Sequence, residues 1–273
     1  MPLAPTSELV QASPVVGANV ILVEQAEAYV AAAESQNRGI ILQLSENAIR
    51  YHAAMAPMVK ALLAIAEASS TAVGVHADHI TNEALVAEAL ELGVMSVMFD
   101  ASADDDETNM SRTSAVVNRF ARSGVWVEGE IGEIGGKGGA HASGALTGVP
   151  DAVMFVERTG VHSLAVAVGS SHHMRAKTAS LNHARIAEIA AAVDTPLVLH
   201  GSSGVPMAQI RSGIRAGLKK INVATEFTVA FTAAVRQALS DSSLTDPRSY
   251  IRPAREATQV AVEEYLRALY REE

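Results

Sequence analysis

Histidines and acids stand at the ends of several short apolar segments of this chain. The segment TAVGVHADHI leads through β-branched residues into Asp78 and His79, and two later segments of the same design reach His172 and His200. Imidazole nitrogens are good zinc ligands, and a catalytic zinc keeps one position open beside three protein ligands. A lone histidine in a strand is more often a core residue. If the segments are parallel strands, however, their ends converge, and His79, His172 and His200 form a Zn²⁺ site.

The spacing within TAVGVHADHI limits which side chains can share that site. Side chains alternate between the two faces of a strand, so His76 and Asp78 lie on one face and His79 on the other. Asp78 and His79 both reach one pocket only if the strand ends between them. His76 is therefore interpreted as a core residue or as a residue that supports the zinc ligands.

Eight apolar segments alternate with helical patterns along the chain. The predicted strands cover 15–23, 39–45, 71–79, 94–100, 125–132, 162–172, 195–203 and 219–226. Strands separated by helices pair in parallel, and eight such units are typical of a (β/α)8 TIM barrel. We predict one such α/β domain over 1–273, with extra N- and C-terminal helices that cover the barrel bottom or join a partner subunit. A doubly wound sheet is the competing fold.

Two predicted helices lie in regions that also contain proline. One continuous helix is predicted over 52–69, and a last helix over 253–273 closes the chain. A short capped helix is expected over 6–12, where Thr6 or Ser7 could serve as the N-cap. These three helices, with those between the strands, are expected to surround the barrel.

Composition narrows the possible partners. The formal charge of −9 argues against nucleic acid as the main partner. The chain has no cysteine, which excludes a disulfide framework and thiolate metal ligands. Its start lacks the charged and apolar regions of a signal peptide, and no apolar run reaches the roughly 18 residues of a membrane span. We therefore expect a cytoplasmic protein with no membrane partner.

Further polar residues stand where the other predicted strands end, at the face of a TIM barrel that carries catalysis. They are Asn19, Ser45, Asp100 with Ser102, Glu128 with Glu130, and Asn222 with Thr225. Asp100 and Glu130 are interpreted as ligands of a second or displaced metal position, or as residues that orient the histidines. An ordinary salt bridge or helix cap is the alternative for each of them.

Two segments near the end of the predicted barrel are suited to a phosphate. HGSSGVP and NVATE follow strands seven and eight, where barrels of this kind often bind phosphate on free backbone N–H groups and a helix N-terminus. Gly201 and Gly204 allow the backbone to approach a ligand, and Ser202, Ser203 and Thr225 supply hydroxyl groups. A plain turn followed by a helix cap is the alternative.

Motifs along nearly the whole chain resemble one enzyme family. The segments are GANVILVEQAEAYVAAAE, LQLSENA, HADH, FDAS, VEGEIGEIGG, VGSSH, VLHGSSG, INVATE and DPRSYIRPAREA. Together they resemble the class II, zinc-dependent ketose-bisphosphate aldolases, which include fructose- and tagatose-bisphosphate aldolases. Any one motif is weak, whereas the set is specific.

The resemblance implies roles for individual residues. It places Asp78 at the catalytic acid/base and His79, His172 and His200 at the zinc ligands. The implied reaction is reversible cleavage of a phosphorylated ketose to dihydroxyacetone phosphate and an aldehyde through a zinc-stabilised enediolate. The expected substrate contacts are Asn19, Ser45, Gly201, Ser202, Ser203, Asn222, Ala224 and Thr225. We also expect a homodimer or homotetramer, and a second divalent or monovalent cation stays an open alternative.

The chain departs from the family pattern at two positions near the expected site. The family loop usually reads Gly-Gly-Glu-Glu, and one of those glutamates moves a proton, but Lys137 and Gly138 stand there. His173 replaces a glycine that lies near the substrate phosphate and a monovalent cation in the family. The exact ketose, its C4 stereochemistry and the second proton transfer are therefore left open.

Three other functions compete with this interpretation. The first is a lyase of the same chemistry for another phosphorylated ketose or keto-acid, such as the deoxy-ketogluconate phosphate of inositol breakdown. The second is a non-catalytic subunit that binds sugar phosphates. The third is a Schiff-base aldolase, which needs a lysine near a strand centre or end. Lys219 and Lys220 are expected to precede strand eight, which disfavours the third alternative.

His141 is predicted to replace the missing loop acid. It lies in GGKGGAHASG (135–144), whose small residues are typical of a lid that closes over a site. An unperturbed lysine is protonated at neutral pH and is a poor base, whereas histidine titrates near neutrality. The alternative is that another group or water removes the C3 proton.

Proton exchange into dihydroxyacetone phosphate tests His141, because that step needs this base and no aldehyde. We expect His141→Ala to exchange the C3 proton more slowly than the wild type, measured by NMR in deuterated water. Equal exchange rates would exclude His141 as the base. If the wild type itself fails to exchange the proton, its substrate is not one that releases dihydroxyacetone phosphate.

Overall fold

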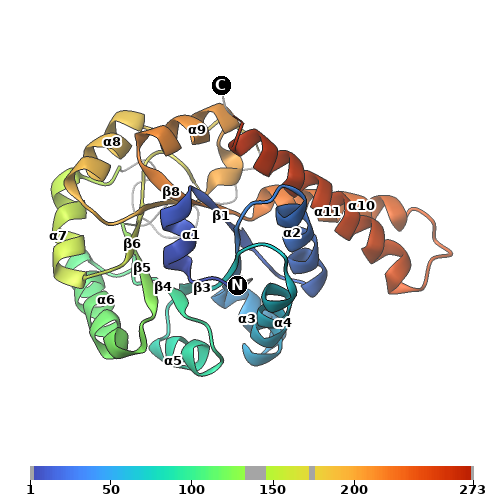
Figure 1. Cartoon of the computed structure of the whole chain (residues 1–273), viewed down its shortest axis with the longest axis horizontal. Helices are drawn as coiled ribbons and strands as arrows, with labels where there is room; N and C mark the ends of the chain where they lie inside the picture. The colour runs from blue at the N-terminus through green and yellow to red at the C-terminus, as the bar shows by residue number, and fades with distance from the viewer. Residues whose placement is uncertain (1–2, 133–145, 172–175, 272–273) are drawn as a thin grey trace.

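A closed ring of eight parallel strands forms the centre of the protein (Figure 1). The computed structural model describes residues 3–132, 146–171 and 176–271. The strands are β1 (Val15–Asn19), β2 (Ile40–Ser45), β3 (Val73–Ile80), β4 (Ser96–Phe99), β5 (Trp126–Ile131), β6 (Ser163–Val166), β7 (Leu197–Leu199) and β8 (Leu218–Val223). Each strand pairs with its neighbours in sequence, and β8 pairs with β1. The predicted (β/α)8 barrel is confirmed, and an open doubly wound sheet is excluded.

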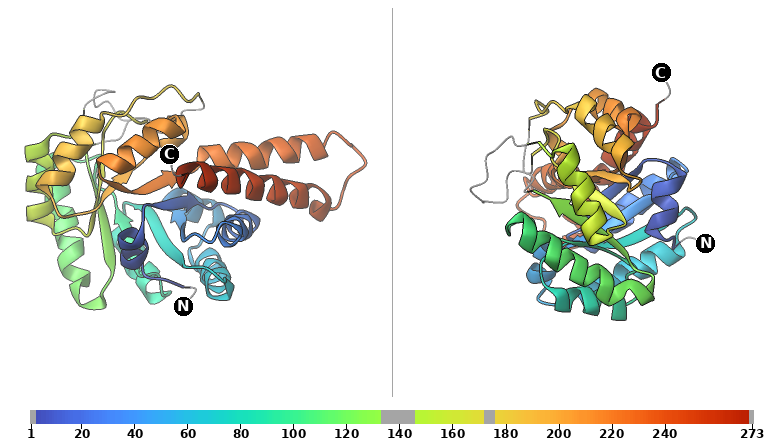
Figure 2. Two further views of the ribbon diagram at one scale, coloured as in Figure 1. Left: turned by 45° about the horizontal axis from the view of Figure 1, so that its top comes forward. Right: turned by 90° about the vertical axis from the view of Figure 1, so that its left-hand side faces the viewer.

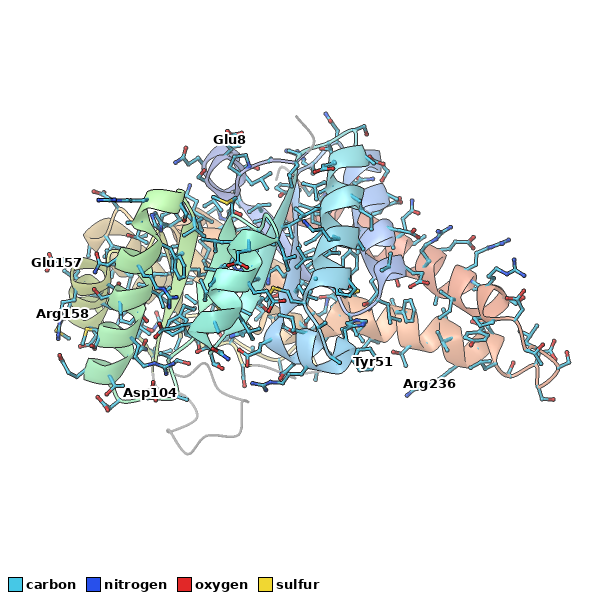
Figure 3. All side chains as sticks on the ribbon, turned by 90° about the horizontal axis from the view of Figure 1, so that it is seen from below. Glu8, Tyr51, Asp104, Glu157, Arg158 and Arg236 are labelled. Carbon is cyan, nitrogen blue, oxygen red and sulfur yellow. The ribbon has the colours of Figure 1, made fainter. Side chains whose placement is uncertain are left out.

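Helices surround the ring, and charged side chains such as Glu157 and Arg158 cover their outer faces (Figure 3). None of the described helices is long and apolar enough to cross a membrane. The α-helices are α1 (Thr6–Ala12), α2 (Val23–Ser35), α3 (Glu46–His52), α4 (Ala56–Ala68), α5 (Glu83–Glu91), α6 (Asp106–Phe120), α7 (Val149–Thr159), α8 (His183–Ala192), α9 (Met207–Ala216), α10 (Thr225–Ala238) and α11 (Pro247–Leu269). Two short 3₁₀ helices are η1 (Ala121–Ser123) and η2 (Ser202–Gly204).

Two predicted helix boundaries were wrong. The helix expected over 52–69 is divided into α3 and α4, because Ala53 has a left-handed backbone with φ of 62° and Pro57 lies in the first turn of α4. The last helix begins at Pro247 rather than at Pro253, and its start is capped by Asp246, whose side chain accepts a hydrogen bond from the Arg248 N–H. Pro253 is accommodated inside α11.

Helix α1 covers the N-terminal ends of the first strands. Leu9 packs against Gly39 and Gly74, where an added Cβ would stand 2.6 and 2.9 Å from leucine methyl carbons. Val10 and Val15 complete this small apolar cluster together with Ile41. The prediction that an end helix covers the barrel bottom is confirmed for α1, which leaves the C-terminal strand ends as the other face of the barrel.

Helices α10 and α11 form a hairpin that projects from one side of the barrel (Figures 1 and 2). Its base is aromatic, because the ring of Phe227 lies 5.4 Å from the rings of both Tyr29 and Tyr265. Helix α11 then returns to the barrel alongside α2, where Arg255 pairs with Glu27 at 2.8 Å. The hairpin is therefore rooted in the barrel wall while its tip extends away from it.

The interior of the ring is more polar than is usual for a TIM barrel, where branched apolar residues dominate. Gln43, His76, Glu128 and Lys220 are fully buried. A buried charge is tolerated when it is paired and hydrogen-bonded, and Lys220 Nζ donates to Glu128 Oε2 at 2.8 Å. The expectation that Lys220 precedes strand eight was wrong, because this lysine lies within β8 and faces the inside of the barrel.

We expect Leu9→Ala to lower the free energy of unfolding by about 2–4 kcal/mol, because the leucine is 6% exposed and the cluster around it cannot close over the lost volume. Met154→Ala is the control, because that methionine of α7 is 42% exposed and its loss should change stability by no more than about 0.5 kcal/mol. Denaturant unfolding of both variants measures the difference. Similar losses in the two variants would show that α1 does not seal the barrel.

Candidate active site

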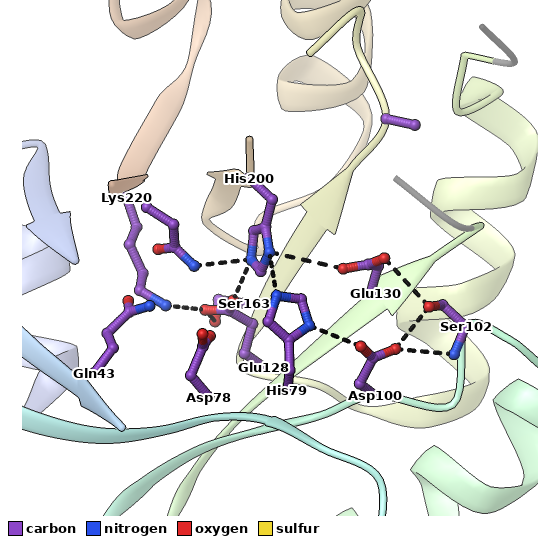
Figure 4. A network of polar contacts seen from close by, with 12 residues as sticks. Gln43, Asp78, His79, Asp100, Ser102, Glu128, Glu130, Ser163, His200 and Lys220 are labelled. Atoms are coloured by element: carbon purple, nitrogen blue, oxygen red, sulfur yellow. Dashed lines mark hydrogen bonds and ion pairs between the residues drawn. The ribbon is translucent and has the colours of Figure 1, made fainter. Parts of the chain in front are cut away.

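The C-terminal strand ends bring three of the predicted metal residues together. His79 lies near the end of β3, Glu130 in β5, and His200 directly follows β7 (Figure 4). Within the part of the chain that the structure describes, potential ligand atoms of these three residues all lie within 4.8 Å of one another. His79 Nε2 is 3.1 Å from His200 Nδ1, which in turn is 3.8 Å from Glu130 Oε2.

An unusual backbone conformation brings both Asp78 and His79 to this site. His79 has φ of 49°, in the left-handed region that non-glycine residues rarely adopt. The pairing of β3 with β4 shifts register between Ala77 and Ile80, so strict alternation is broken there. The strand does not end between Asp78 and His79 as the sequence required. The left-handed residue within β3 turns both side chains toward the site instead, and such backbone strain is typical of functional sites.

Asp100 orients the ring of His79. Its Oδ2 lies 2.7 Å from His79 Nδ1, which leaves Nε2 directed at the centre of the site. Asp100 is itself held by Ser102, whose backbone N–H and hydroxyl lie 3.2 and 2.6 Å from Oδ1. A carboxylate that accepts from one histidine nitrogen fixes which nitrogen is free to bind metal. This contact favours the orienting role among the alternatives for Asp100.

The donor set fits a divalent metal ion. Two imidazoles and a carboxylate are ligands that zinc accepts, at bond lengths of about 2.0–2.2 Å. Tetrahedral ligands at such distances stand about 3.3 Å apart, close to the 3.1 Å between the two ring nitrogens. His172 lies outside the described residues, so its role as the third histidine ligand stays a prediction.

Asp78 is held by one oxygen and left open at the other. Asn19 Nδ2 donates to Oδ2 at 2.7 Å, and Gln43 Nε2 lies 3.3 Å from the Asn19 carbonyl oxygen. Oδ1 of Asp78 is buried and has no hydrogen-bond partner among the described residues. Burial alone would raise the pKa of this carboxyl, but the charges of His79 and His200 beside it lower the pKa overall. The carboxylate is therefore ionised and can take a proton at Oδ1.

The loops after β7 and β8 meet at the start of α10. Gly201 has φ of 65°, a conformation that glycine adopts without strain, and the turn of η2 follows it. Ser203 Oγ accepts from the Glu226 N–H at 3.2 Å, and Ser202 donates to the Asn222 carbonyl at 2.6 Å. These contacts join the two loops. The start of a 14-residue helix beside them is a favourable environment for an anion.

The remaining candidates are placed as follows. Ser45 ends β2 and is the N-cap of α3, where its hydroxyl accepts from the Ala48 N–H at 3.2 Å. Ala224 is exposed and precedes α10, and Thr225 is the first residue of that helix. Asn222 lies in β8, with its side-chain nitrogen 3.0 Å from His200 Nε2. His141 and the whole predicted lid lie outside the described residues.

His76 is buried in the barrel, as predicted. Its Nδ1 lies 2.7 Å from the hydroxyl of Ser96 on the neighbouring strand. Burial, together with the positive charge of Lys220, lowers the pKa of His76 well below the usual value, so the ring is neutral. His76 therefore supports the interior rather than the metal site.

Sequence reasoning assigned no role to the buried residues Gln43, Glu128 and Lys220. A signal was present in VEGEI and KKINV, because alternation puts Glu128 on the same face as Glu130 and Lys220 on the same face as Asn222. Residues that share a face with a predicted site residue within one strand point into the same interior. That rule, applied to both strands, would have found the buried ion pair.

Comparison with known proteins identifies the family. Residues 11–273 match the family described as fructose-bisphosphate aldolase class-II. This chain belongs to that family. It is therefore a metal-dependent aldolase, a lyase that breaks a carbon–carbon bond.

Relatives of known name and structure agree with this assignment. The fructose-bisphosphate aldolase of Thermus caldophilus is 36% identical, over 88% of this chain and 87% of that protein. That of Staphylococcus epidermidis is also 36% identical, over 91% and 89%. The crystal structure of the YdjI aldolase from Escherichia coli K12 has a TM-score of 0.85 and 28% identity, covering 97% of this chain and 94% of that one. The aldolase resemblance that the motifs indicate is thus confirmed along nearly the full length.

We expect Asn19→Leu to lower kcat by about 10-fold or more while KM and metal content stay near those of the wild type. The amide fixes Asp78 Oδ2, so its loss frees the carboxylate to turn, and correct placement is part of the roughly 10²- to 10⁴-fold that an acid–base group contributes. Asn118→Leu, at an exposed position of α6, is the control. A rise in KM with unchanged kcat would instead assign Asn19 to substrate binding.

Proposed function

We propose that this aldolase reversibly cleaves a phosphorylated ketose, of the fructose- or tagatose-bisphosphate type, to dihydroxyacetone phosphate and an aldehyde. The observation that carries the proposal is the unpartnered Oδ1 of Asp78 beside the facing nitrogens of His79 and His200. A base next to a divalent-metal site is the pair of functions that such a cleavage needs. The names of the relatives from Thermus and Staphylococcus support the same substrate class.

The metal site of the proposal consists of His79, His172 and His200, with Glu130 beside them. The resident ion is proposed to be Zn²⁺, which when bound supplies a Lewis acid for the substrate carbonyl oxygen. Asp100 holds His79 through Nδ1 and so keeps Nε2 directed at the ion. Glu130 and His200 are fully buried, whereas the side chain of His79 is 20% exposed.

Proton movement begins at Asp78. Its Oδ1 takes the proton of the C4 hydroxyl while the C3–C4 bond breaks, the C4 oxygen becomes the aldehyde, and the bonding electron pair remains with C3. That pair is shared with the C2 carbonyl group as an enediolate, and Asn222 is placed to hydrogen-bond it. A proton then returns to C3, and His141 is the proposed donor. In the direction of synthesis the same groups exchange roles.

The phosphate of the substrate is proposed to bind at the joined loops after β7 and β8. Gly201, Ser203 and Thr225 would hold it with backbone N–H groups and hydroxyls, at the positive end of α10. In a protein of formal charge −9, an anionic substrate needs such a local group of donors. Ser45 and Ala224 are proposed as further contacts of the sugar.

Association into a homodimer or homotetramer belongs to the same proposal. The α10–α11 hairpin carries Val229, Leu239 and Val260, which are 46–53% exposed. Apolar side chains on an element that projects from the barrel favour burial against another subunit.

We expect Asp78→Ala to keep near-normal zinc content and to lose cleavage by about 10²- to 10⁴-fold, the usual span for removal of an acid–base group. Metal content is measured by atomic emission and cleavage by release of dihydroxyacetone phosphate. Asp78→Asn keeps the shape and the Asn19 contact and should be as inactive. Loss of metal in these variants would reassign Asp78 as a ligand.

The substrate class is tested with metal-free enzyme reloaded with Zn²⁺ or Co²⁺ and a panel of phosphorylated ketoses. We expect chelation to abolish turnover and reloading to restore it with a ketose bisphosphate. Lys137 and His173 stand where the family has other residues. This departure is the reason to keep one alternative substrate, another phosphorylated keto-acid such as deoxy-ketogluconate phosphate. That compound belongs in the panel. Turnover after verified metal removal, or equal use of an unphosphorylated ketose, would contradict the proposal.

A further inference from the structure

A buried ion pair crosses the barrel interior directly beneath the metal site. Lys220 Nζ in β8 lies 2.8 Å from Glu128 Oε2 in β5, and both residues are fully buried (Figure 4). Strands β5 and β8 are not neighbours in the ring, so this pair joins two strands that share no backbone hydrogen bonds. Removing two charges from water is unfavourable, and apolar residues of similar size often stabilise a fold as well or better. The pair therefore calls for a role other than stability.

Glu128 also contacts a proposed metal ligand. Its second oxygen, Oε1, lies 3.0 Å from His200 Nε2. Glu128 Oε2, which accepts from Lys220, also accepts from the hydroxyl of Ser163 at 3.2 Å. Ser163 in turn accepts from Trp126 Nε1 at 2.9 Å. Both carboxylate oxygens are thus occupied, and the group has no freedom to turn away from His200.

The two histidines are held by opposite ring nitrogens. Asp100 Oδ2 lies beside Nδ1 of His79, whereas Glu128 Oε1 and the Asn222 amide lie beside Nε2 of His200. The other two ring nitrogens face each other at 3.1 Å. The ring planes stand at 87° with their centres 4.8 Å apart, so the two imidazoles meet edge to face and are not stacked. Without an acceptor at Nε2, His200 could carry its proton on Nδ1 and would then be unable to bind an ion there.

We propose that Glu128 and Lys220 act together as positioning residues that keep the proton of His200 on Nε2 and aim Nδ1 at the metal ion. Glu128 is the acceptor, and Lys220 supplies the opposite charge that lets a carboxylate occupy the middle of the barrel. The inference rests on the metal site of the proposed function. It adds two residues to which the sequence motifs gave no role.

Direct measurement of metal binding tests this without any substrate. The variants are Glu128→Gln, Lys220→Met and the double variant E128Q/K220M, compared with the wild type for Zn²⁺ affinity, for the visible spectrum with Co²⁺, and for the Tm of the metal-free protein. Substitutions at residues that support ligands typically weaken metal affinity about 10- to 100-fold. Val262→Ala, at a fully buried position of α11 remote from the site, is the control for lost stability alone.

Each variant has a distinct expected result. Lys220→Met should lower both the Tm and the metal affinity, because Glu128 is left buried without its partner charge. The double variant removes both charges of this pair, so neither is left buried without its partner, and it should recover most of the Tm. It should nevertheless bind Zn²⁺ about 10- to 100-fold more weakly and show an altered Co²⁺ spectrum. Val262→Ala should lower the Tm and leave both metal readouts unchanged.

Two results would overturn the inference. If the double variant binds metal with wild-type affinity and spectrum, the ion pair serves the fold alone. If borohydride with substrate inactivates the wild type but spares Lys220→Met, the lysine is a nucleophile rather than a partner of Glu128. Failure of the proposed metal site is distinguishable from both, because in that case the wild type itself binds no Zn²⁺. Failure of the proposed substrate class shows in the ketose panel, with Zn²⁺ binding unchanged.

Discussion

The parallel pairing of β8 with β1 closes the ring of strands, and the active site exists only inside that ring. Closure points every strand end to the same face, so side chains from β3, β5, β7 and β8 meet although Asp78 and Asn222 are far apart in sequence. It also gives the ring an interior, where side chains of β5 and β8, which are three strands apart in the ring, meet. The contacts that aim His200 are thus a product of closure as much as of residue type.

Charge is the second organising feature of this interior. Asp78, Asp100, Glu128 and Glu130 are at most 8% exposed, whereas Lys220 is the only lysine or arginine among the buried residues that the structure describes. Pairing with Lys220 offsets one of the four acids, and hydrogen bonds from Asn19 and Ser102 stabilise two others. The remaining excess of negative charge beside two imidazoles favours a divalent cation, because an ion-sized positive charge satisfies several acceptors at once.

Much of the architecture could be predicted, because apolar strand patterns followed by helical ones repeat eight times and because Asp78, His79 and His200 stand at strand ends. What escaped prediction depends on contacts distant in sequence. The residue type of His79 alone does not specify a left-handed backbone, which accompanies the shifted pairing of β3 with β4. Lys220 looks like a residue at the exposed start of a strand until β5 supplies the acid that lets it be buried.

The docking of α11 along α2 ties the end of the chain to its beginning, as Arg255 reaches Glu27 and the Tyr270 hydroxyl reaches the Pro14 carbonyl. A nascent chain that has not yet produced β8 and α11 therefore has an unpaired edge on β1 and an uncovered face on α2. Unpaired strand edges invite contacts between chains during synthesis. Strand β1 is made first, but its second neighbour, β8, is the last strand to be made. The closed barrel can therefore form only after nearly the whole polypeptide has left the ribosome.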